Sequence, residues 1–285
     1  MSVHVIGASG RSGTALVSAL LAAGTEVVPV VRNLEKWRAS GLAAEPRLAD
    51  IENSATLRAV LADGTSIISC AHARHAAAVL AASPADARHI FLGSTRKFTR
   101  WPDAHGNGVL AGEAAFLATG RSGVMLHPTM IYGAAGENNV QRLAAILARL
   151  PVLPLPDGGR ARVQPIHQDD VTRAILAALA IAWNGPHALT ICGPEAVTYA
   201  QFATAVAAAA RLRRPRLINI PASVLIGLAT ITKRLPGLPR IHPEEIRRLL
   251  EDKAFDPAPF EKTLGFIPIS LEDGLARTFA KPKKT

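Results

Sequence analysis

The chain has 285 residues, of which 49% are hydrophobic and 19% are charged. At about 150 residues per domain this length allows one large α/β unit or two modest domains, and the apolar content argues against a disordered protein. Cys70 and Cys192 are the only cysteines, and both lie in apolar stretches. The composition therefore excludes a small disulfide-stapled scaffold and argues against an iron–sulfur cluster or a zinc cage. A reducing, cytoplasmic setting is expected.

The charge is strongly basic, with 32 Lys and Arg against 22 Asp and Glu and a formal net charge of +10. Most of the excess lies from Arg211 onward, where the chain has 15 basic and 8 acidic residues. No aromatic residues alternate with these basic residues, as a platform for stacked bases would require. We therefore expect no nucleic-acid partner, and we interpret the basic tail at 281–284 as a solvated chain end.

No segment has the length of a membrane span. Strand-like residues begin at Val3 without a preceding basic and apolar leader, so no signal peptide is expected. The longest apolar stretch, Ala222–Thr232, has eleven residues, whereas a bilayer needs about 20. We expect a core helix there. A peripheral contact stays open, because the adjacent Lys233 and Arg234 suit anionic lipid headgroups.

Apolar runs alternate with helical periods through the first half of the chain. The predicted strands cover 3–6, 27–31, a short run before Ala49, 67–70, 89–92 and 124–126, and the predicted helices cover 14–23, 54–62, 73–82 and 110–118. Repeated βα units predict a parallel sheet with helices on both faces, and strands buried on both faces are apolar throughout. The sequence thus predicts six parallel strands in a doubly wound α/β fold.

The simple alternation ends after Pro128, where prolines and the Asp157-Gly158-Gly159 turn interrupt it. Asp169 and Asp170 precede an apolar-periodic helix at 171–182, and we interpret them as a helix start rather than as catalytic carboxylates. The remaining predicted elements are a strand at 188–191 and helices at 198–210, 244–251 and 271–279. We expect a dinucleotide-binding domain at 1–150 and a smaller, mostly helical lobe at 151–285, interleaved with it.

A glycine-rich turn joins the first predicted strand to the first predicted helix. Gly7 permits a tight exit from the strand, Gly10 lets the backbone approach a pyrophosphate, and Gly13 lets the helix pack closely on the sheet. The helix N-terminus offers unsatisfied N–H donors to phosphate groups. The predicted phosphate-binding residues are Gly7, Ser9, Gly10, Arg11, Ser12 and Gly13.

The residue after the second strand bears on the choice of cofactor. An acid at this position would bind the ribose 2′-hydroxyl of NAD, but the sequence has Arg32. A guanidinium clamps a 2′-phosphate, and Arg11 and Lys36 are near in sequence. NADP(H) is therefore predicted, with NAD less favoured. The alternative is that Arg32 caps a helix end or stacks on the adenine without selecting for phosphate.

Several motifs together resemble the atypical or extended short-chain dehydrogenases/reductases over nearly the whole chain. They are Gly7-x-x-Gly10-x-x-Gly13, Ala49-Asp50-Ile51, Leu92-Gly93-Ser94-Thr95, His127-Pro128-Thr129-Met130-Ile131-Tyr132-Gly133, Gln164 to Val171 and Cys192-Gly193-Pro194-Glu195. The last two are also similar to the sugar-nucleotide epimerase-like branch and to the dinucleotide-binding accessory subunit of respiratory complex I. The resemblance implies a Rossmann fold with a smaller C-terminal substrate lobe.

The same resemblance implies further cofactor contacts. Asp50 and Ile51 would flank the adenine, Cys70 and Ala71 would line the cofactor ribose, and Pro128, Met130 and Ile131 would cover the nicotinamide.

The chain departs from this family at the catalytic Tyr-x-x-x-Lys motif. Aligning the helix through Glu113 places His105 at the tyrosine position and Val109 at the lysine position. In the family the lysine binds the nicotinamide ribose and lowers the tyrosine pKa, so that the phenol exchanges a proton with the substrate. Val109 does neither, and the usual proton relay is therefore absent.

Two functional interpretations follow. In the first, the protein is an NADP-dependent oxidoreductase or epimerase-like enzyme on a small carbonyl or sugar-like substrate, with His105 as proton donor and Ser94 as a second hydrogen-bond donor. Lys97 and Tyr132 are reserve proton donors, and the alternative for His105 is a loop histidine in a flexible 105–108 stretch. In the second, the protein binds NADP(H) without turnover and acts as a redox sensor or assembly partner.

The remaining motifs carry less chemistry. His72 and His75 are three residues apart on a predicted helix, but no third ligand is near in sequence, so no metal site is expected. Ser94 lacks the second glycine of a hydrolase nucleophile turn. A small-molecule substrate is the expected partner, and the sequence leaves the oligomeric state open.

Overall fold

The structure, a computed structural model, describes residues 2–134, 139–150, 152–232 and 243–280. The basic tail at 281–284, Lys233 and Arg234 lie outside the described residues. The chain divides into two compact units, which are described separately here. The first consists of Met1–Thr129, Gln168–Ile191 and Pro257–Ile267, and the second of Met130–His167, Cys192–Asp256 and Pro268–Thr285. The first change of unit thus falls after Thr129, and two later segments, 168–191 and 257–267, return to the first unit.

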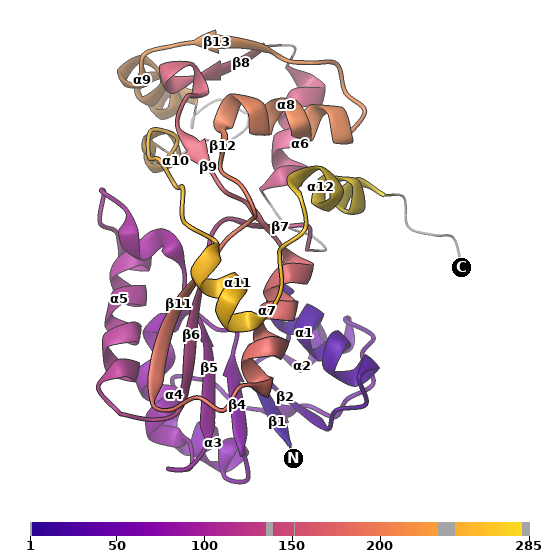
Figure 1. Ribbon diagram of the computed structural model, residues 1–285, viewed down its shortest axis with the longest axis vertical. Coiled ribbons are helices and arrows are strands. Elements are labelled where there is room, and N and C mark those ends of the chain that lie inside the picture. Colours follow the sequence, from indigo (N-terminus) through magenta and orange to yellow (C-terminus); the bar gives the residue numbers. More distant parts are fainter. Residues whose placement is uncertain (1, 135–138, 151, 233–242, 281–285) are drawn as a thin grey trace. The chain divides into compact units, whose positions relative to one another are not determined.

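The first unit contains a seven-stranded sheet whose neighbouring strands all pair in parallel (Figure 1). In spatial order the strands are β11 (Pro186–Ile191), β6 (Gly123–Pro128), β5 (Arg88–Leu92), β4 (Ser66–Ser69), β1 (Val3–Ile6), β2 (Val27–Val31) and β3 (Arg47–Leu48). The strand order reverses between β1 and β4, and ligands of such sheets bind outside the carboxyl ends of the strands at this switch point. The predicted doubly wound α/β fold is confirmed.

The expected number of six strands is wrong, because the run at 188–191 is not part of a separate lobe. It forms β11, which pairs with β6 along its whole length from Pro186 opposite Gly123 to Ile191 opposite Pro128. Helix α7 (Gln168–Ala180) brings the chain back to the sheet and begins with Asp169 and Asp170 in its first turn, as the acidic start predicted.

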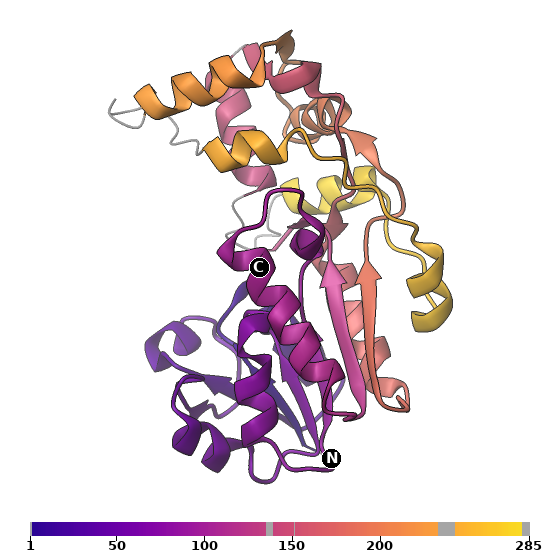
Figure 2. The ribbon, with the colours of Figure 1, turned by 90° about the vertical axis from the view of Figure 1, so that its left-hand side faces the viewer.

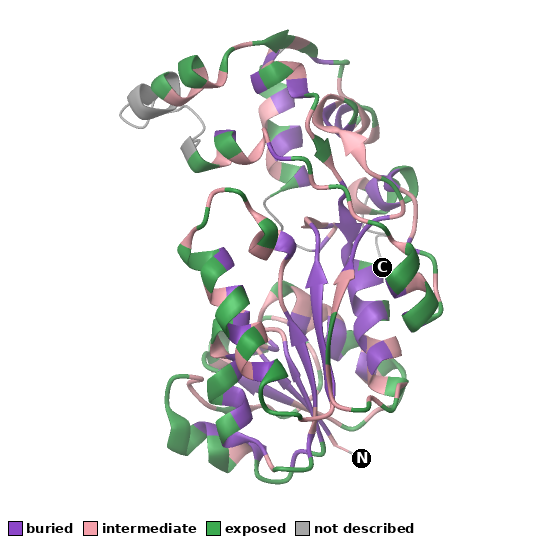
Figure 3. Cartoon of the chain, turned by 60° about the vertical axis from the view of Figure 1, so that its left-hand side comes forward, coloured by how far each residue is buried: buried purple, intermediate pink, exposed green. Residues whose placement is uncertain are grey.

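Helices cover both faces of the sheet (Figures 1 and 2). The helices α3 (Ser54–Leu61), α4 (Ala76–Ala82) and α5 (Ala104–Leu117) share one hydrophobic cluster with the strands, and α1 (Arg11–Ala22) and α7 contact each other on the opposite face. The first unit also contains α2 (Leu34–Arg38), α11 (Ala258–Leu264) and the short 3-10 helices η1 (Ala73–His75) and η2 (Thr95–Phe98). Figure 3 shows the central strands buried and the outer helix faces exposed, which explains why those strands are apolar throughout.

Helix α5 begins six residues earlier than the sequence predicted. The Asp103 side chain accepts the backbone N–H of Gly106 at 2.8 Å and caps the first turn. The 105–108 stretch is therefore helical, and the flexible-loop alternative for His105 is wrong. A Cβ on Gly112 would overlap the backbone carbonyl of Ala73, so the glycines that weaken the helical pattern allow α5 to approach η1 closely.

The second unit is built from short strand pairs and helices around its own core. Its helices are α6 (Val140–Arg149), α8 (Tyr199–Ala209), α9 (Ala222–Thr232), α10 (Pro243–Arg248), α12 (Leu271–Phe279) and the 3-10 helix η3 (Pro156–Gly159). Its strand pairs are β7 (Ile131–Tyr132) with β10 (Ile166–His167), β8 (Val152–Leu155) with β13 (Arg216–Asn219), and β9 (Arg162–Val163) with β12 (Val197–Thr198). The hydrophobic cluster joins α6, α8 and α12 around Tyr132.

The expectation of a core helix at Ala222–Thr232 is wrong for the side chains that the structure describes. The segment is helical, but residues 222–227 are all half-buried or exposed, and Val224 is 49% exposed. The helix packs mainly on α10 and η3, two short elements that cover little of it. Within the described ranges no helix has the length and apolar content needed to cross a membrane.

His89 of β5 makes the stability of the first unit depend on pH. The side chain is fully buried, stacked on Phe91 with 5.7 Å between ring centroids. Burial, followed by the charge of Arg121, lowers the pKa of His89 from 6.5 to about 4. Between pH 6.5 and 4 the unfolded chain therefore binds a proton that the folded chain does not, and the unfolding free energy falls as the pH falls.

We expect His89→Leu to flatten this dependence. One such group contributes a slope of about 1.4 kcal/mol per pH unit within this window, and the variant lacks it. A residual slope remains, because the pKa values of His72 and His127 are also lowered to about 4. Urea unfolding at pH 7, 6, 5 and 4.5 measures the slopes, and equal slopes for the two proteins would contradict the prediction.

Candidate functional site

The glycine turn lies at the switch point, between the end of β1 and the start of α1. Gly7 has a φ of +75°, and a Cβ there would lie 3.1 Å from the backbone nitrogen of Ala71, in the segment after β4. A Cβ on Gly10 would lie 3.1 Å from the Gly7 carbonyl oxygen, and one on Gly13 would overlap it. The turn therefore needs glycine at Gly7 for its positive φ and at Gly13 for the close approach, whereas a side chain at Gly10 would be a tight fit.

The start of α1 keeps backbone donors available for a ligand. Gly10 is the N-cap residue and provides no side-chain cap, so the first amides of the helix receive none. The neighbouring hydroxyls are engaged within the first unit: Ser12 donates to Oε1 of Gln168 at 2.8 Å, and Thr14 donates to the Ala8 carbonyl at 3.0 Å. Backbone N–H groups and the helix dipole, rather than these hydroxyls, suit this turn to an anion.

Arg32 directly follows β2 and is exposed. Among the residues that the structure describes, no hydrogen bond or ion pair engages the side chain of Arg32, nor that of Arg11, which is exposed on the first turn of α1. Asn33 is the cap of α2, accepting the backbone N–H of Lys36 at 2.8 Å. The sequence-based alternative that Arg32 caps this helix is therefore not supported by the geometry.

The residues that the family resemblance assigns to adenine and ribose lie near the same edge. Oδ1 of Asp50 accepts the backbone N–H of Glu52 at 3.0 Å, which fastens the turn after β3. Ile51 and Ala71 both pack against the hydrophobic cluster of the first unit. Burial raises the pKa of the Cys70 thiol to about 12, so Cys70 offers a neutral, unreactive surface.

The residues expected to cover the nicotinamide are divided between the units. Pro128 ends β6 in the first unit, whereas Met130 and Ile131 belong to the second. Met130 packs against the hydrophobic cluster of the second unit, and Tyr132, a reserve proton donor, is buried within that cluster at 1% exposure.

Ser94 follows β5 and forms part of a firmly held turn. The Gly93 N–H donates to the Leu126 carbonyl at 2.7 Å, and the Thr95 hydroxyl donates to the Pro128 carbonyl at 3.2 Å. The Ser94 hydroxyl oxygen accepts the N–H of Arg96 at 3.1 Å and caps η2. This bond uses the oxygen as an acceptor and leaves the hydroxyl proton available for donation.

His105 is exposed on the first turn of α5, with its ring edge-on to that of His72 at 4.3 Å between centroids. His72 follows Ala71, so the contact joins α5 to the segment after β4. Burial, followed by the charges of His105 and Arg74, lowers the pKa of His72 to about 4. Val109, one turn further along α5, is buried in the hydrophobic cluster and faces the core.

A cluster of ionisable groups that the sequence did not predict lies between η2, α5 and β6. Oε2 of Glu113 accepts from Nζ of Lys97 at 2.5 Å and lies 3.0 Å from Nε2 of His127. The side chains of Lys97, Glu113 and His127 are 10%, 14% and 1% exposed. Burial, followed by the charge of Lys97, lowers the pKa of His127 to about 4. The sequence predicts Lys97 as a reserve proton donor and places Glu113 and His127 in two separate motifs, but no spacing indicates that the three side chains meet.

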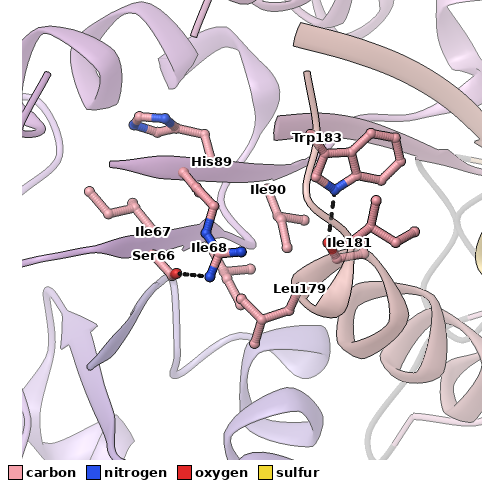
Figure 4. Close-up of a pocket in the computed structure, with 10 residues that line it drawn as sticks. Ser66, Ile67, Ile68, His89, Ile90, Leu179, Ile181 and Trp183 are labelled. Atoms are coloured by element: carbon pink, nitrogen blue, oxygen red, sulfur yellow. Dashed lines mark hydrogen bonds between the residues drawn. The ribbon is translucent and has the colours of Figure 1, made fainter. Parts of the chain in front are cut away.

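A very small pocket lies near the other end of the sheet (Figure 4). The first residues of β4 and β5 line it together with Leu179 of α7 and with Ile181 and Trp183, which follow that helix. The guanidinium of Arg88 donates to the Ser66 hydroxyl at 3.2 Å within it. None of the residues that the sequence assigned to cofactor or catalysis lines this pocket, so we do not place it in the candidate site.

Comparisons with known proteins agree with this geometry. Residues 7–148 match the family model described as NAD(P)H-binding. Uncharacterized proteins of Mycobacterium bovis and Mycobacterium tuberculosis are 28% identical over 218 residues, which are 72% of this chain. The match spans 23% of the length of these relatives.

Solved structures are similar over almost the whole chain. The UDP-glucose 4-epimerase of Thermotoga maritima, solved with UDP-glucose, has a TM-score of 0.75 at 16% identity and covers 98% of this chain and 97% of its own. The UDP-glucuronic acid 4-epimerase of Bacillus cereus, solved with UDP-glucuronic acid and NAD, has a TM-score of 0.74 at 17% identity and covers 98% of both chains. Residues 7–148 are therefore similar to the NAD(P)H-binding family, and the chain shares the Rossmann-like α/β fold of these solved epimerases.

Proposed function

We propose that this protein is an NADP(H)-dependent oxidoreductase that acts on a small carbonyl or sugar-like substrate. The observation that carries the proposal is the combination of an uncapped helix start after the glycine turn with an exposed, unpaired Arg32 after β2. The first suits a pyrophosphate, and the second suits the additional 2′-phosphate of NADP(H). Likeness to epimerases solved with UDP-sugars supports the sugar-like substrate class.

The residues of the first unit fit such a cofactor. Side chains at Gly7, Gly10 and Gly13 would press on neighbouring backbone of the turn that would hold the pyrophosphate. Arg11 and Arg32 supply positive charge on the adenosine side, and Asp50 with Ile51 borders the adenine. Bound NADP(H) supplies or accepts the hydride.

Ser94 and His105 are the proposed groups for the substrate oxygen. Ser94 donates its hydroxyl proton in a hydrogen bond, since its oxygen already accepts the Arg96 N–H. His105 is the proton donor, since histidine titrates near neutrality and its side chain is exposed at the start of α5. Together they stand in for the tyrosine and lysine that this chain lacks at residues 105 and 109.

A second candidate function is a redox sensor or assembly partner that binds NADP(H) without turnover. The buried Val109 favours it, because no ammonium group is present at this position to bind a ribose or to lower the pKa of a neighbouring acid. The two functions share the cofactor and differ in whether NADPH is consumed.

Arg32→Ala tests the cofactor preference. We expect the Kd for NADPH to rise about 10- to 100-fold, because a charge-assisted hydrogen bond to phosphate is worth about 1.5–3 kcal/mol, while the Kd for NADH changes little. Titration calorimetry with both cofactors measures the difference. Arg58→Ala is the matched control, since Arg58 is exposed on α3 and lies outside the proposed site. Equal weakening of both cofactors would show that Arg32 does not select for the phosphate.

Variants at Ser94 and His105 test the oxidoreductase. We expect Ser94→Ala and His105→Gln each to lower kcat for NADPH-dependent carbonyl reduction about 10- to 1000-fold, since one hydrogen-bond donor or a general acid contributes roughly this much, with the Kd for NADPH nearly unchanged. NADPH absorbance with a panel of aldehydes, ketones and quinones follows the reaction. Binding of NADPH without oxidation by any member of the panel would favour the sensor.

A further inference from the structure

The buried cluster of Lys97, Glu113 and His127 ends at the backbone of Ser94. The Ser94 N–H donates to Nδ1 of His127 at 3.2 Å, so the neutral ring carries its proton on Nε2. That nitrogen lies 3.0 Å from Oε2 of Glu113, which also accepts from Lys97. The contacts therefore run from the Lys97 ammonium to the Glu113 carboxylate, then to the His127 imidazole and finally to the Ser94 backbone amide.

This order distinguishes two roles for the cluster. A proton relay needs a group at its end that both gives and takes a proton, and a peptide N–H does not exchange its proton in this way at neutral pH. The contact between His127 and Ser94 can hold the peptide, but it cannot deliver a proton to a substrate through it. The geometry therefore favours a holding role over a relay.

The contacts of His127 show that it holds the turn after β5 in place. A Cβ on Gly93 would overlap the His127 ring, so the turn after β5 lies directly against the imidazole. Bonds from Gly93 to Leu126 and from Thr95 to Pro128 fix the same turn to β6. The hydroxyl of Ser94, between these anchors, has its direction set by the backbone that carries it.

We propose that Glu113 and His127 are positioning residues that fix Ser94 for its hydrogen bond to the substrate oxygen. This inference rests on the proposed oxidoreductase function. Glu113 selects the His127 tautomer that accepts the Ser94 N–H, and Lys97 holds the carboxylate in place. The ion pair between Lys97 of η2 and Glu113 of α5 thus fixes side chains at this edge of the sheet. In the family, the Tyr-x-x-x-Lys pair that this chain lacks would do so.

Substitutions that keep an acceptor but cannot pass a proton test the inference. Glu113→Gln retains an oxygen facing His127, and His127→Asn retains an acceptor near the position of Nδ1, whereas Glu113→Leu and His127→Leu remove them. We expect the leucine variants to lose at least 10-fold in kcat with menadione and 4-nitrobenzaldehyde as probes. The glutamine and asparagine variants should stay within about 3-fold of the original protein.

Two binding and exchange measurements accompany the kinetics. The Kd for NADPH, from quenching of protein fluorescence, should stay within about 2-fold in all four variants, since none of the substituted groups is assigned to the cofactor. Hydrogen exchange of the Ser94 amide should be at least 10-fold faster in His127→Leu and unchanged in His127→Asn. Glu45→Leu is the control, because Glu45 is exposed in the segment between α2 and β3. If the lone ammonium left by Glu113→Gln prevents folding, Lys97→Met with Glu113→Gln restores neutrality.

Each outcome decides the inference. Glutamine and asparagine variants as slow as the leucine variants would establish a relay and overturn it, and leucine variants with unchanged kcat and exchange would overturn any positioning role. A protein that binds NADPH but reduces neither probe nor any other carbonyl in the panel would also overturn it, while leaving cofactor binding intact. Failure to bind NADPH would contradict the proposed function itself. Hydrogen exchange of the Ser94 amide would then be the one measurement that tests whether His127 positions Ser94.

Discussion

The close approach of three backbone segments at the switch point of the sheet determines where a ligand can bind. Gly7 and Gly13 lie so near each other that no Cβ fits at Gly13, and Ala71 lies against Gly7 from the other side. This packing exists because β1 pairs in parallel with β2 on one edge and β4 on the other. The start of α1 thereby lies at the carboxyl edge of the sheet, where parallel sheets of this kind bind their ligands.

Parts of the fold that depend on local patterns could be predicted from the sequence. The βα alternation and the glycine turn are local patterns, since they depend on periods of a few residues and on backbone angles. The return of the chain to the first unit through β11 is not local, because pairing with β6 is decided by the sheet. Likewise, Asp103 starts α5 early through a cap that outweighs the glycines at 106 and 108.

The candidate site, too, could be predicted only in part from the sequence. The glycine turn and Arg32 could be located from the sequence because both lie at strand ends, and the structure places them after β1 and after β2. The cluster of Lys97, Glu113 and His127 joins three elements, and no sequence spacing encodes the 2.5 Å and 3.0 Å contacts of Glu113. In helix α9 the sequence pattern predicted more than the structure shows. An apolar run predicts burial, but the described side chains of 222–227 are half-buried or exposed.

Two histidines of the first unit, His72 and His127, differ from His105 in the exposure of their side chains. His72 accepts the Arg74 N–H and His127 accepts the Ser94 N–H, each through Nδ1, and burial keeps the pKa of both at about 4. Both are therefore neutral near pH 7 and act as fixed acceptors rather than acids. His105, by contrast, is exposed at the start of α5. Nδ1 of His72 and Nδ1 of His127 are thus each committed to holding a backbone N–H.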